Sequence, residues 1–250
     1  MKKIGILGGV GWASTIDYYR AICEGAGRFF ADRGAAAPLP VPPITIESVV
    51  QAQTRALRGR PGDEASWAAF DAVFRDALLT LERAGCDFAL IASNTPHARL
   101  HAIREGVVMP VLSIFDATAR ATAASGTTQA LVLGTAVTMQ ARNYANVLAE
   151  HGVSANDTLP DAEIAEMQAM IDEDFHGGAA SGAQVRLLRF CARHAQPGTA
   201  ILLACTELPL AFPDRIDDVS FEAGGFLFVN PSAAHVAAAL DLALEEERAG

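Results

Sequence analysis

The sequence predicts an α/β fold made of two similar domains with parallel sheets. Short apolar runs alternate with longer amphipathic segments along the chain, which is the pattern of strand–helix–strand units. The two halves also share a spacing, because Tyr18 follows Gly8 of "ILGG" and Tyr144 follows Gly134 of "VLGT", each by 10 residues. Together these observations indicate an internal duplication.

The predicted elements follow from local pattern and punctuation. Apolar runs bounded by Gly or small polar residues predict strands at 4–9, 44–48, 88–93, 130–135, 200–205 and 226–230. Amphipathic stretches predict helices at 14–30, 66–85, 138–152 and 231–250. Asn94 or Thr95 is expected to cap a helix whose first turn contains Pro96.

Two Rossmann-like domains with parallel sheets, related by a pseudo-two-fold axis, are the expected architecture. Residues 1–115 and a returning segment, 226–250, are expected to form the first domain, and residues 116–225 the second. Open α/β sheets bind ligands beyond the carboxyl ends of their strands. The strands at 88–93 and 200–205 end in Ala-Ser and Ala-Cys, so Ser93 and Cys205 are expected at equivalent positions, facing one cleft between the domains from opposite sides.

Composition excludes several functional classes. With 250 residues, 51% hydrophobic and 19% charged, the chain is expected to form a packed core. A net charge of −10 and 19 scattered Lys and Arg residues disfavour a nucleic-acid partner. No apolar run approaches the roughly 20 residues that span a bilayer, and the start "MKKIGILGGVGWA" suits a strand and loop better than a signal peptide. A cytoplasmic protein without membrane contact is expected.

The cysteines show neither a CxxC pair nor metal-ligand spacing, so they are expected to be thiols and no metal site is expected. Cys23, Cys86 and Cys191 lie on helical or helix-flanking patterns and are interpreted as structural.

Four motifs occur in a fixed order between residues 4 and 209: "GILGGVGWASTIDYY", "SNTPH", "LGTAVTM" and "CTELP". In these motifs the chain resembles the aspartate/glutamate racemase family, whose members need no cofactor. The resemblance implies a two-base mechanism in which one group removes the α-proton of an amino acid and another protonates the opposite face. It implies that Cys205 is one acid/base group, that Ser93 lies opposite, and that the protein is a homodimer.

The resemblance also implies roles for neighbouring residues, and it implies an amino-acid substrate. The residues that it implies for binding the α-carboxylate or lining the cleft are Asn94, Thr95, Thr206, Gly9, Gly11, Thr135 and Thr138. Amide donors at helix starts suit a carboxylate on physical grounds alone. Glu207 is a candidate to tune the Cys205 thiol or to transfer a proton, and it is equally interpretable as a solvated first-turn acid.

The chain departs from the family pattern at the first catalytic residue and at the side-chain anchors. Ser93 stands where the family usually has Cys, and a hydroxyl needs an adjacent base to do the work of a thiolate. His97 is near in sequence but is expected on a helix surface. The family's anchoring Arg has only Gln53 or Arg55 as counterparts, with Arg55 the candidate, and "GGAASGAQVR" has no counterpart to its Lys.

Two other kinds of function remain open. A dinucleotide-dependent oxidoreductase would use Gly9 and Gly11 in a GxGxxG turn, but Ser14 occupies the third glycine position and Glu47 lies 38 residues after Gly9 instead of about 20. The other candidate is a one-base family member: a decarboxylase, an enzyme acting mainly on one enantiomer, or a non-catalytic amino-acid binder.

Overall fold

The computed structural model describes residues 1–60, 62–156, 159–175 and 178–249. Gly177, at the start of the Gly-rich stretch of the second half, therefore lies outside the described residues. The chain divides into two compact units, one formed by Met1–Ser113 with His235–Gly250 and the other by Ile114–Ala234. No helix in the described part of the chain is long and apolar enough to cross a membrane.

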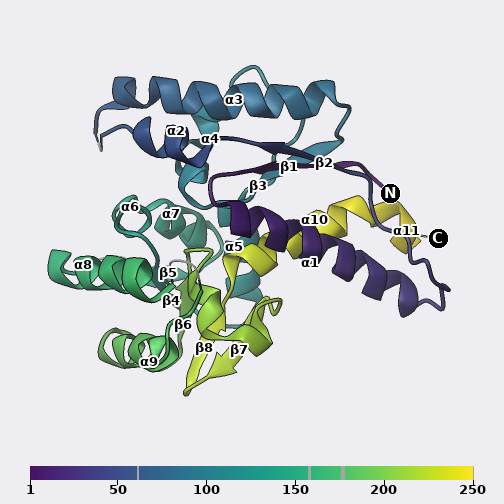
Figure 1. The fold of residues 1–250 in the computed structure, drawn as a ribbon. Coiled ribbons are helices and arrows are strands. Elements are labelled where there is room, and N and C mark those ends of the chain that lie inside the picture. The colour runs from purple at the N-terminus through teal and green to yellow at the C-terminus, as the bar shows by residue number, and fades with distance from the viewer. Residues whose placement is uncertain (61, 157–158, 176–177, 250) are drawn as a thin grey trace. The chain divides into compact units, whose positions relative to one another are not determined.

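The first unit is a parallel sheet with helices on both faces (Figure 1). Its strands are β1 (Ile4–Gly8), β2 (Ile44–Ser48) and β3 (Phe88–Ile91), in the order β2-β1-β3. Its helical elements are α1 (Trp12–Ala31), α2 (Gln51–Ala56), η1 (Glu64–Trp67), α3 (Ala68–Arg83), η2 (Thr95–Arg99), α4 (Leu100–Ile103), α11 (Glu245–Ala249) and most of α10 (Pro231–Ala243). An isolated parallel bridge between Ala89 and Val111 extends the sheet beside β3.

Strand residues of the first sheet alternate between two cores, as the two-residue period of a strand requires. Leu7 packs with α3, in a core that includes Phe74. Ile4 and Ile6 pack on the opposite face with α1 and α10, in a core that includes Tyr18. Both faces of the sheet are thus covered, which explains why β1 and β3 are buried apolar runs, whereas β2, at the edge of the sheet, contains polar residues and is partly exposed.

The second unit has a larger sheet, in the order β5-β4-β6-β8-β7. Its strands are β4 (Gln129–Leu133), β5 (Ser154–Asn156), β6 (Thr199–Leu203), β7 (Ser220–Ala223) and β8 (Phe226–Val229). The helical elements are α5 (Ile114–Ala124), α6 (Ala136–Gln140), α7 (Asn143–Glu150), α8 (Asp161–Met170), the π-helix η3 (Ile171–Phe175), α9 (Ala183–His194), η4 (Leu208–Ala211) and η5 (Pro213–Arg215). Cores on the two faces of the sheet contain alternate residues of β4 and β6.

The predicted α/β class with mainly parallel sheets is confirmed, with two differences. β7 runs antiparallel to β8, because the two strands form a hairpin that turns through Gly224 and Gly225, both with positive φ. Residues 226–234, which the sequence predicted in the first domain, lie in the second unit because β8 pairs in parallel with β6. The chain returns to the first unit only at His235.

Candidate active site

Ser93 and Cys205 occupy equivalent positions in their respective units. In the first unit the amide of Ala92 donates to the carbonyl of Leu7 at 2.9 Å, and in the second the amide of Ala204 donates to the carbonyl of Leu133 at 2.6 Å. The strand orders β2-β1-β3 and β5-β4-β6 also correspond. Ser93 follows the carboxyl end of β3, which pairs with β1, and Cys205 follows the carboxyl end of β6, which pairs with β4. Open α/β sheets bind their ligands beyond such strand ends.

Cys205 is buried, with 7% of its surface exposed, and its thiol lies beside a carboxylate. The thiol donates a hydrogen bond to Oε2 of Glu207, with an Sγ–Oε2 distance of 3.7 Å. Burial raises the pKa of Cys205 to about 12; the negative charge of Glu207 acts in the same direction, and the amides of Glu207 and Leu208 oppose the rise. The sulfur is therefore a protonated thiol at neutral pH, with a proton acceptor in contact.

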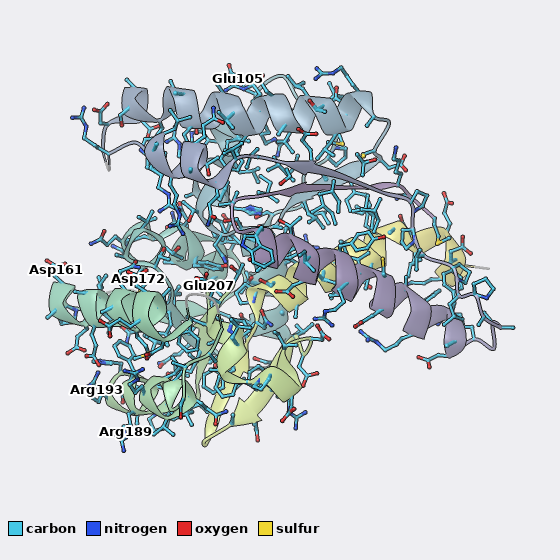
Figure 2. All side chains as sticks on the ribbon, in the orientation of Figure 1. Glu105, Asp161, Asp172, Arg189, Arg193 and Glu207 are labelled. Atoms are coloured by element: carbon cyan, nitrogen blue, oxygen red, sulfur yellow. The ribbon has the colours of Figure 1, made fainter. Side chains whose placement is uncertain are left out.

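The segment that holds Glu207 is a short turn rather than a long helix. Glu207, labelled in Figure 2, occupies the residue before η4, and Pro209 is in the first turn. Leu208 is buried and its amide donates to the carbonyl of Cys205 at 3.2 Å. Thr206 and Glu207 are half-buried, so both side chains remain within reach of solvent or a small ligand.

Ser93 is half-buried and lacks the partner that Cys205 has. Its amide donates to the carbonyl of Ile91 at 2.8 Å, but no hydrogen bond joins its hydroxyl to another residue in the described part of the chain. The sequence predicted His97 on a helix surface, and this prediction is wrong. The ring of His97 is buried and lies edge-on to that of His235, with centroids 5.3 Å apart.

Asn94 and Thr95 follow Ser93 in a turn of 3-10 helix rather than an α-helix. The amide of His97 donates to the carbonyl of Asn94 at 3.0 Å, three residues back, and the Asn94 side chain does not cap the turn. The predicted capped α-helix is therefore wrong here: a 3-10 helix without a side-chain cap occupies Thr95–Arg99, and α4 begins only at Leu100.

The Gly-rich loop after β1 is held by its own threonine. Gly9 has φ +86°, and a Cβ there would lie 2.1 Å from the carbonyl oxygen of Val49, so only glycine fits. The Gly9 amide donates to Oγ1 of Thr15 at 2.9 Å, and the carbonyl of Gly11 accepts from the same hydroxyl at 3.3 Å. The Gly9 amide thus already has a partner, which the sequence did not reveal.

The loop after β4 is capped in a comparable way. Thr135 is the N-cap of α6, where its Oγ1 accepts from the Thr138 amide at 3.4 Å and lies 3.1 Å from Oγ1 of Thr138. The Ala136 amide donates to Oε1 of Gln168 on α8, at 2.9 Å. Gln168 was missed in the sequence because it lies 32 residues from the loop that it supports.

Arg55 lies exposed on α2 and forms no ion pair with the residues that the structure describes. Partial burial of the guanidinium of Arg58, with the charge of Arg55 as a second cause, lowers the pKa of Arg58. Two neighbouring cations that form no ion pair with a described acidic residue favour an anion in their vicinity.

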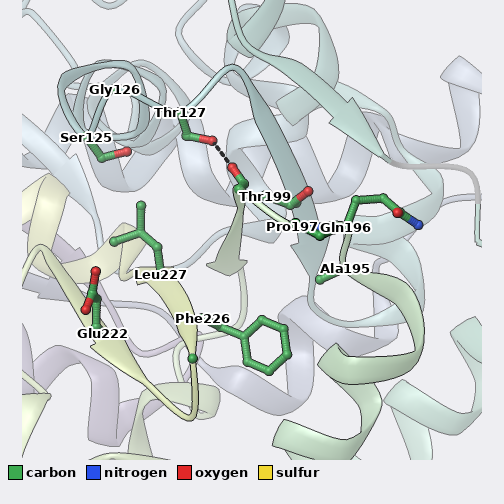
Figure 3. Close-up of a pocket in the computed structure, with 12 residues that line it drawn as sticks. Ser125, Gly126, Thr127, Ala195, Gln196, Pro197, Thr199, Glu222, Phe226 and Leu227 are labelled. Atoms are coloured by element: carbon green, nitrogen blue, oxygen red, sulfur yellow. Dashed lines mark hydrogen bonds between the residues drawn. The ribbon is translucent and has the colours of Figure 1, made fainter.

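The described cavities do not contain the Ser93 or Cys205 motifs. A cavity of about 550 Å³ lies at the amino end of β4, β6 and β8, with Glu222 as its charged residue (Figure 3). There the hydroxyl of Thr127 donates to the carbonyl of Gly198 at 2.7 Å. A second cavity, of about 300 Å³, lies between β2 and α3 in the first unit. Across the described residues, no group of three or more His, Cys, Asp or Glu side chains could hold a metal ion.

Comparison with known proteins identifies the family and the fold of the chain. Residues 7–239 match the family model of the Asp/Glu/hydantoin racemases. An aspartate racemase homologue from Pyrococcus horikoshii OT3 is 26% identical, with a TM-score of 0.73 over 97% of this chain and 99% of that one. Aspartate racemase from Picrophilus torridus has the same fold at 19% identity, with a TM-score of 0.70 over 97% and 94% of the two chains.

Glutamate racemase from Campylobacter jejuni shares the fold at 20% identity, with a TM-score of 0.59 over 98% of this chain and 85% of that one. The family match covers both strand ends and both loops described above. The chain therefore belongs to the Asp/Glu/hydantoin racemase family of isomerases.

Proposed function

We propose that this protein exchanges the α-proton of a free amino acid without a cofactor, with Cys205 as the acid/base group on one face and Ser93 on the other. The observation that supports this best is the pair formed by the Cys205 thiol and the Glu207 carboxylate, 3.7 Å apart at the end of β6. A thiol with a raised pKa becomes a base only if something accepts its proton, and Glu207 is in contact to do so.

In the proposed reaction Glu207 takes the proton of Cys205, and the thiolate then removes the α-proton. The electron pair of the C–H bond stays on the substrate, delocalised into its carboxylate, and a new S–H bond forms. The Ser93 hydroxyl protonates the opposite face and takes a proton back from water, and Glu207 releases the proton that it took to the hydroxide ion that remains. Asn94, Thr95 and Thr206 are proposed to bind the α-carboxylate, because all three lie in the turns that follow the two strand ends.

The loop residues have a narrower proposed role. Thr135, Thr138 and Gly11 are proposed to line the site, whereas the Gly9 amide can donate to a ligand only if it leaves Oγ1 of Thr15. Gly9 is therefore proposed to shape the loop rather than to bind the carboxylate, since its left-handed backbone brings the chain close to Val49.

An acidic amino acid is the proposed substrate. Arg55 supports this assignment because it carries a charge that no acidic group in the described part of the chain neutralises, and because Arg58 adds a second positive charge beside it. A dicarboxylic amino acid offers the anion that such a pair would bind. The proposal also includes a cytoplasmic homodimer, and the dimer is tested by the mass measured in analytical ultracentrifugation.

A one-base reaction is the second candidate, and the Ser93 hydroxyl favours it. That hydroxyl has no hydrogen-bonded base among the described residues, in contrast to the thiol of Cys205. An unassisted hydroxyl is a poor base, so Ser93 would protonate a carbanion more readily than it would remove an α-proton. The result would be an enzyme that acts from one enantiomer, or a decarboxylase.

The test is exchange of the α-hydrogen in deuterated water, followed by proton NMR with each enantiomer of aspartate, glutamate and several neutral amino acids. Exchange with inversion from both enantiomers supports the racemase. Exchange from one enantiomer only supports the one-base reaction. Cys205→Ala is the control, and undiminished exchange in this variant would overturn the proposed role of Cys205. Silence over the whole panel, for exchange and for release of carbon dioxide, would overturn both candidates.

A further inference from the structure

A series of hydrogen-bonded, buried polar groups lies in the first unit, which also contains Ser93. The hydroxyl of Tyr18 on α1 is 3.1 Å from Nδ1 of His235 on α10, and Nε2 of His235 is 3.1 Å from the carbonyl oxygen of Leu112. Tyr18 and His235 are buried, with 1% and 0% of their surfaces exposed. A buried polar group destabilises the folded state unless it is hydrogen-bonded, so these hydrogen bonds are a specific feature of the fold.

The direction of each hydrogen bond in this series follows from the chemistry of its ends. A carbonyl oxygen can only accept, so Nε2 of His235 carries a proton and donates it to Leu112. Burial lowers the pKa of His235 to about 4, against a smaller opposing effect of the Leu112 carbonyl, so the ring is neutral and Nδ1 carries no proton. Nδ1 must then accept from Tyr18, whose hydroxyl is the donor.

The hydrogen-bonded series of Tyr18, His235 and Leu112 is linked to the Ser93 motif by two contacts. The ring of His97, in the turn that follows Ser93, lies edge-on to His235 at an interplanar angle of 83°. The amide of Leu112 donates to the carbonyl of Ala89 in β3 at 2.8 Å, so the segment that His235 holds is also hydrogen-bonded to the strand that leads to Ser93. His235 thus braces both the strand and the turn that flank Ser93.

The opposite face of the same turn is held by an ion pair. Arg99, the last residue of η2, donates from Nε and Nη2 to the carboxylate of Asp71 on α3 at 3.2 and 2.7 Å. Its Nη1 bonds Glu64 of η1. The turn is therefore held on the α10 side by the contact of His97 with His235 and on the α3 side by the ion pair of Arg99 with Asp71.

The second unit has a different environment at the corresponding place. Tyr144, which matches Tyr18 in its spacing from the strand glycine, lies edge-on to Phe115 with ring centroids 4.5 Å apart. The side chain at Cys205 is instead oriented by Glu207. Removal of the Tyr18 and His235 hydrogen bonds should therefore act on one strand end and leave the other unchanged.

We infer that Tyr18, His97 and His235 are positioning residues for the Ser93 side of the reaction, holding the turn that carries Ser93, Asn94 and Thr95 in a fixed place relative to β3. The inference rests on the proposed function for its catalytic meaning. The positioning itself is a property of the folded first unit, and it can be measured without turnover.

The experiment introduces a thiol by Ser93→Cys and measures iodoacetamide alkylation at positions 93 and 205 by peptide mass spectrometry over a range of pH. Because the rate depends on the surroundings of each sulfur, it reports on the position of the turn. Adding His235→Leu should change the alkylation rate at position 93 by roughly tenfold, or shift the apparent pKa of that thiol by about one unit. Either change is of the order expected for a lost buried hydrogen bond. Tyr18→Phe, which removes a single hydroxyl and is the milder variant, should give a smaller change.

Three comparisons decide the outcome. His235→Gln retains an amide donor for the carbonyl of Leu112, so the alkylation rate at position 93 should stay close to that of Ser93→Cys alone. Tyr144→Phe should leave the alkylation rate at position 93 unchanged. Alkylation of Cys205 should stay the same in all variants. The inference would be overturned if neither His235→Leu nor Tyr18→Phe changed the alkylation rate at position 93. It would also be overturned if the alkylation rates at positions 93 and 205 changed equally.

An exchange measurement with the native Ser93 separates this inference from the proposed function. If the wild-type protein exchanges both enantiomers, Tyr18→Phe should lower kcat for the enantiomer that depends on Ser93 several-fold more than for the other. If the wild-type protein exchanges neither, the proposed function fails, and the alkylation rates still decide whether the turn is positioned by His235.

Discussion

Acidification tests the neutral state of the buried imidazoles in the first unit. Burial holds the pKa of His235 at about 4, against 6.5 for an ordinary histidine. Between these two values the unfolded chain binds a proton that the folded chain does not, so the free energy of unfolding falls as the pH falls from 6.5 to about 4. Over this whole pH range the free energy of unfolding falls by roughly 3 kcal/mol, and about 2 kcal/mol of this is lost between about pH 7 and pH 5. Burial, and secondarily His235, also lowers the pKa of His97, which acts in the same direction.

Denaturation by guanidinium, followed by tryptophan fluorescence, measures this loss of stability in the first unit, to which His235 belongs. Both tryptophans, Trp12 and Trp67, belong to the first unit. His235→Leu should lose about 2 kcal/mol less than the wild-type protein between these pH values, because leucine has no proton to bind. His101→Gln, at an exposed position of the same unit, is the control and should lose as much as the wild type. An identical loss in His235→Leu and wild type would refute the reasoning.

Three further predictions concern the two strand ends. Glu207→Gln should reduce α-proton exchange about 100-fold without unfolding the protein, because the amide cannot take the proton of Cys205; exchange kinetics and circular dichroism check this, and a wild-type rate would contradict it. Ser93→Cys should raise the exchange rate from the enantiomer that reacts slowly, since a thiol ionises more readily than a hydroxyl, and NMR with each enantiomer decides. Arg99→Leu should destabilise the first unit by about 3–5 kcal/mol, because Asp71 would remain buried without its partner; thermal unfolding measures the loss, and a shift within error would show that the ion pair contributes little.

The sequence predicted the fold well wherever a local pattern determined the element. Buried parallel strands appear as unbroken apolar runs, so β1, β3, β4 and β6 were visible. β7 was not, because "SFEA" has the exposed and buried alternation of an edge strand and is only four residues long. The end of the second unit was also shifted, since the pairing of β8 with β6 is a long-range contact that no local pattern encodes.

The candidate site shows the same limit more sharply. The motifs located Ser93 and Cys205, and the shared hydrogen bonds of Ala92 and Ala204 explain why the two positions correspond. What supports them was hidden: Gln168 holds a loop 32 residues away, and His235 packs on a histidine more than 100 residues earlier in the chain. Such partners depend on how helices lie over the sheet, and apolar periodicity specifies only which face of each helix is buried.

The protonated state of Cys205 has a consequence for oxidative chemistry. Peroxides attack the thiolate and not the thiol, and burial holds the pKa of this sulfur at about 12. The resting protein should therefore keep Cys205 reduced under conditions that oxidise exposed, more acidic cysteines. In the proposed reaction the thiolate exists only while Glu207 holds the proton. The contact that is proposed to activate the sulfur would therefore confine its sensitivity to peroxide to the moments of turnover.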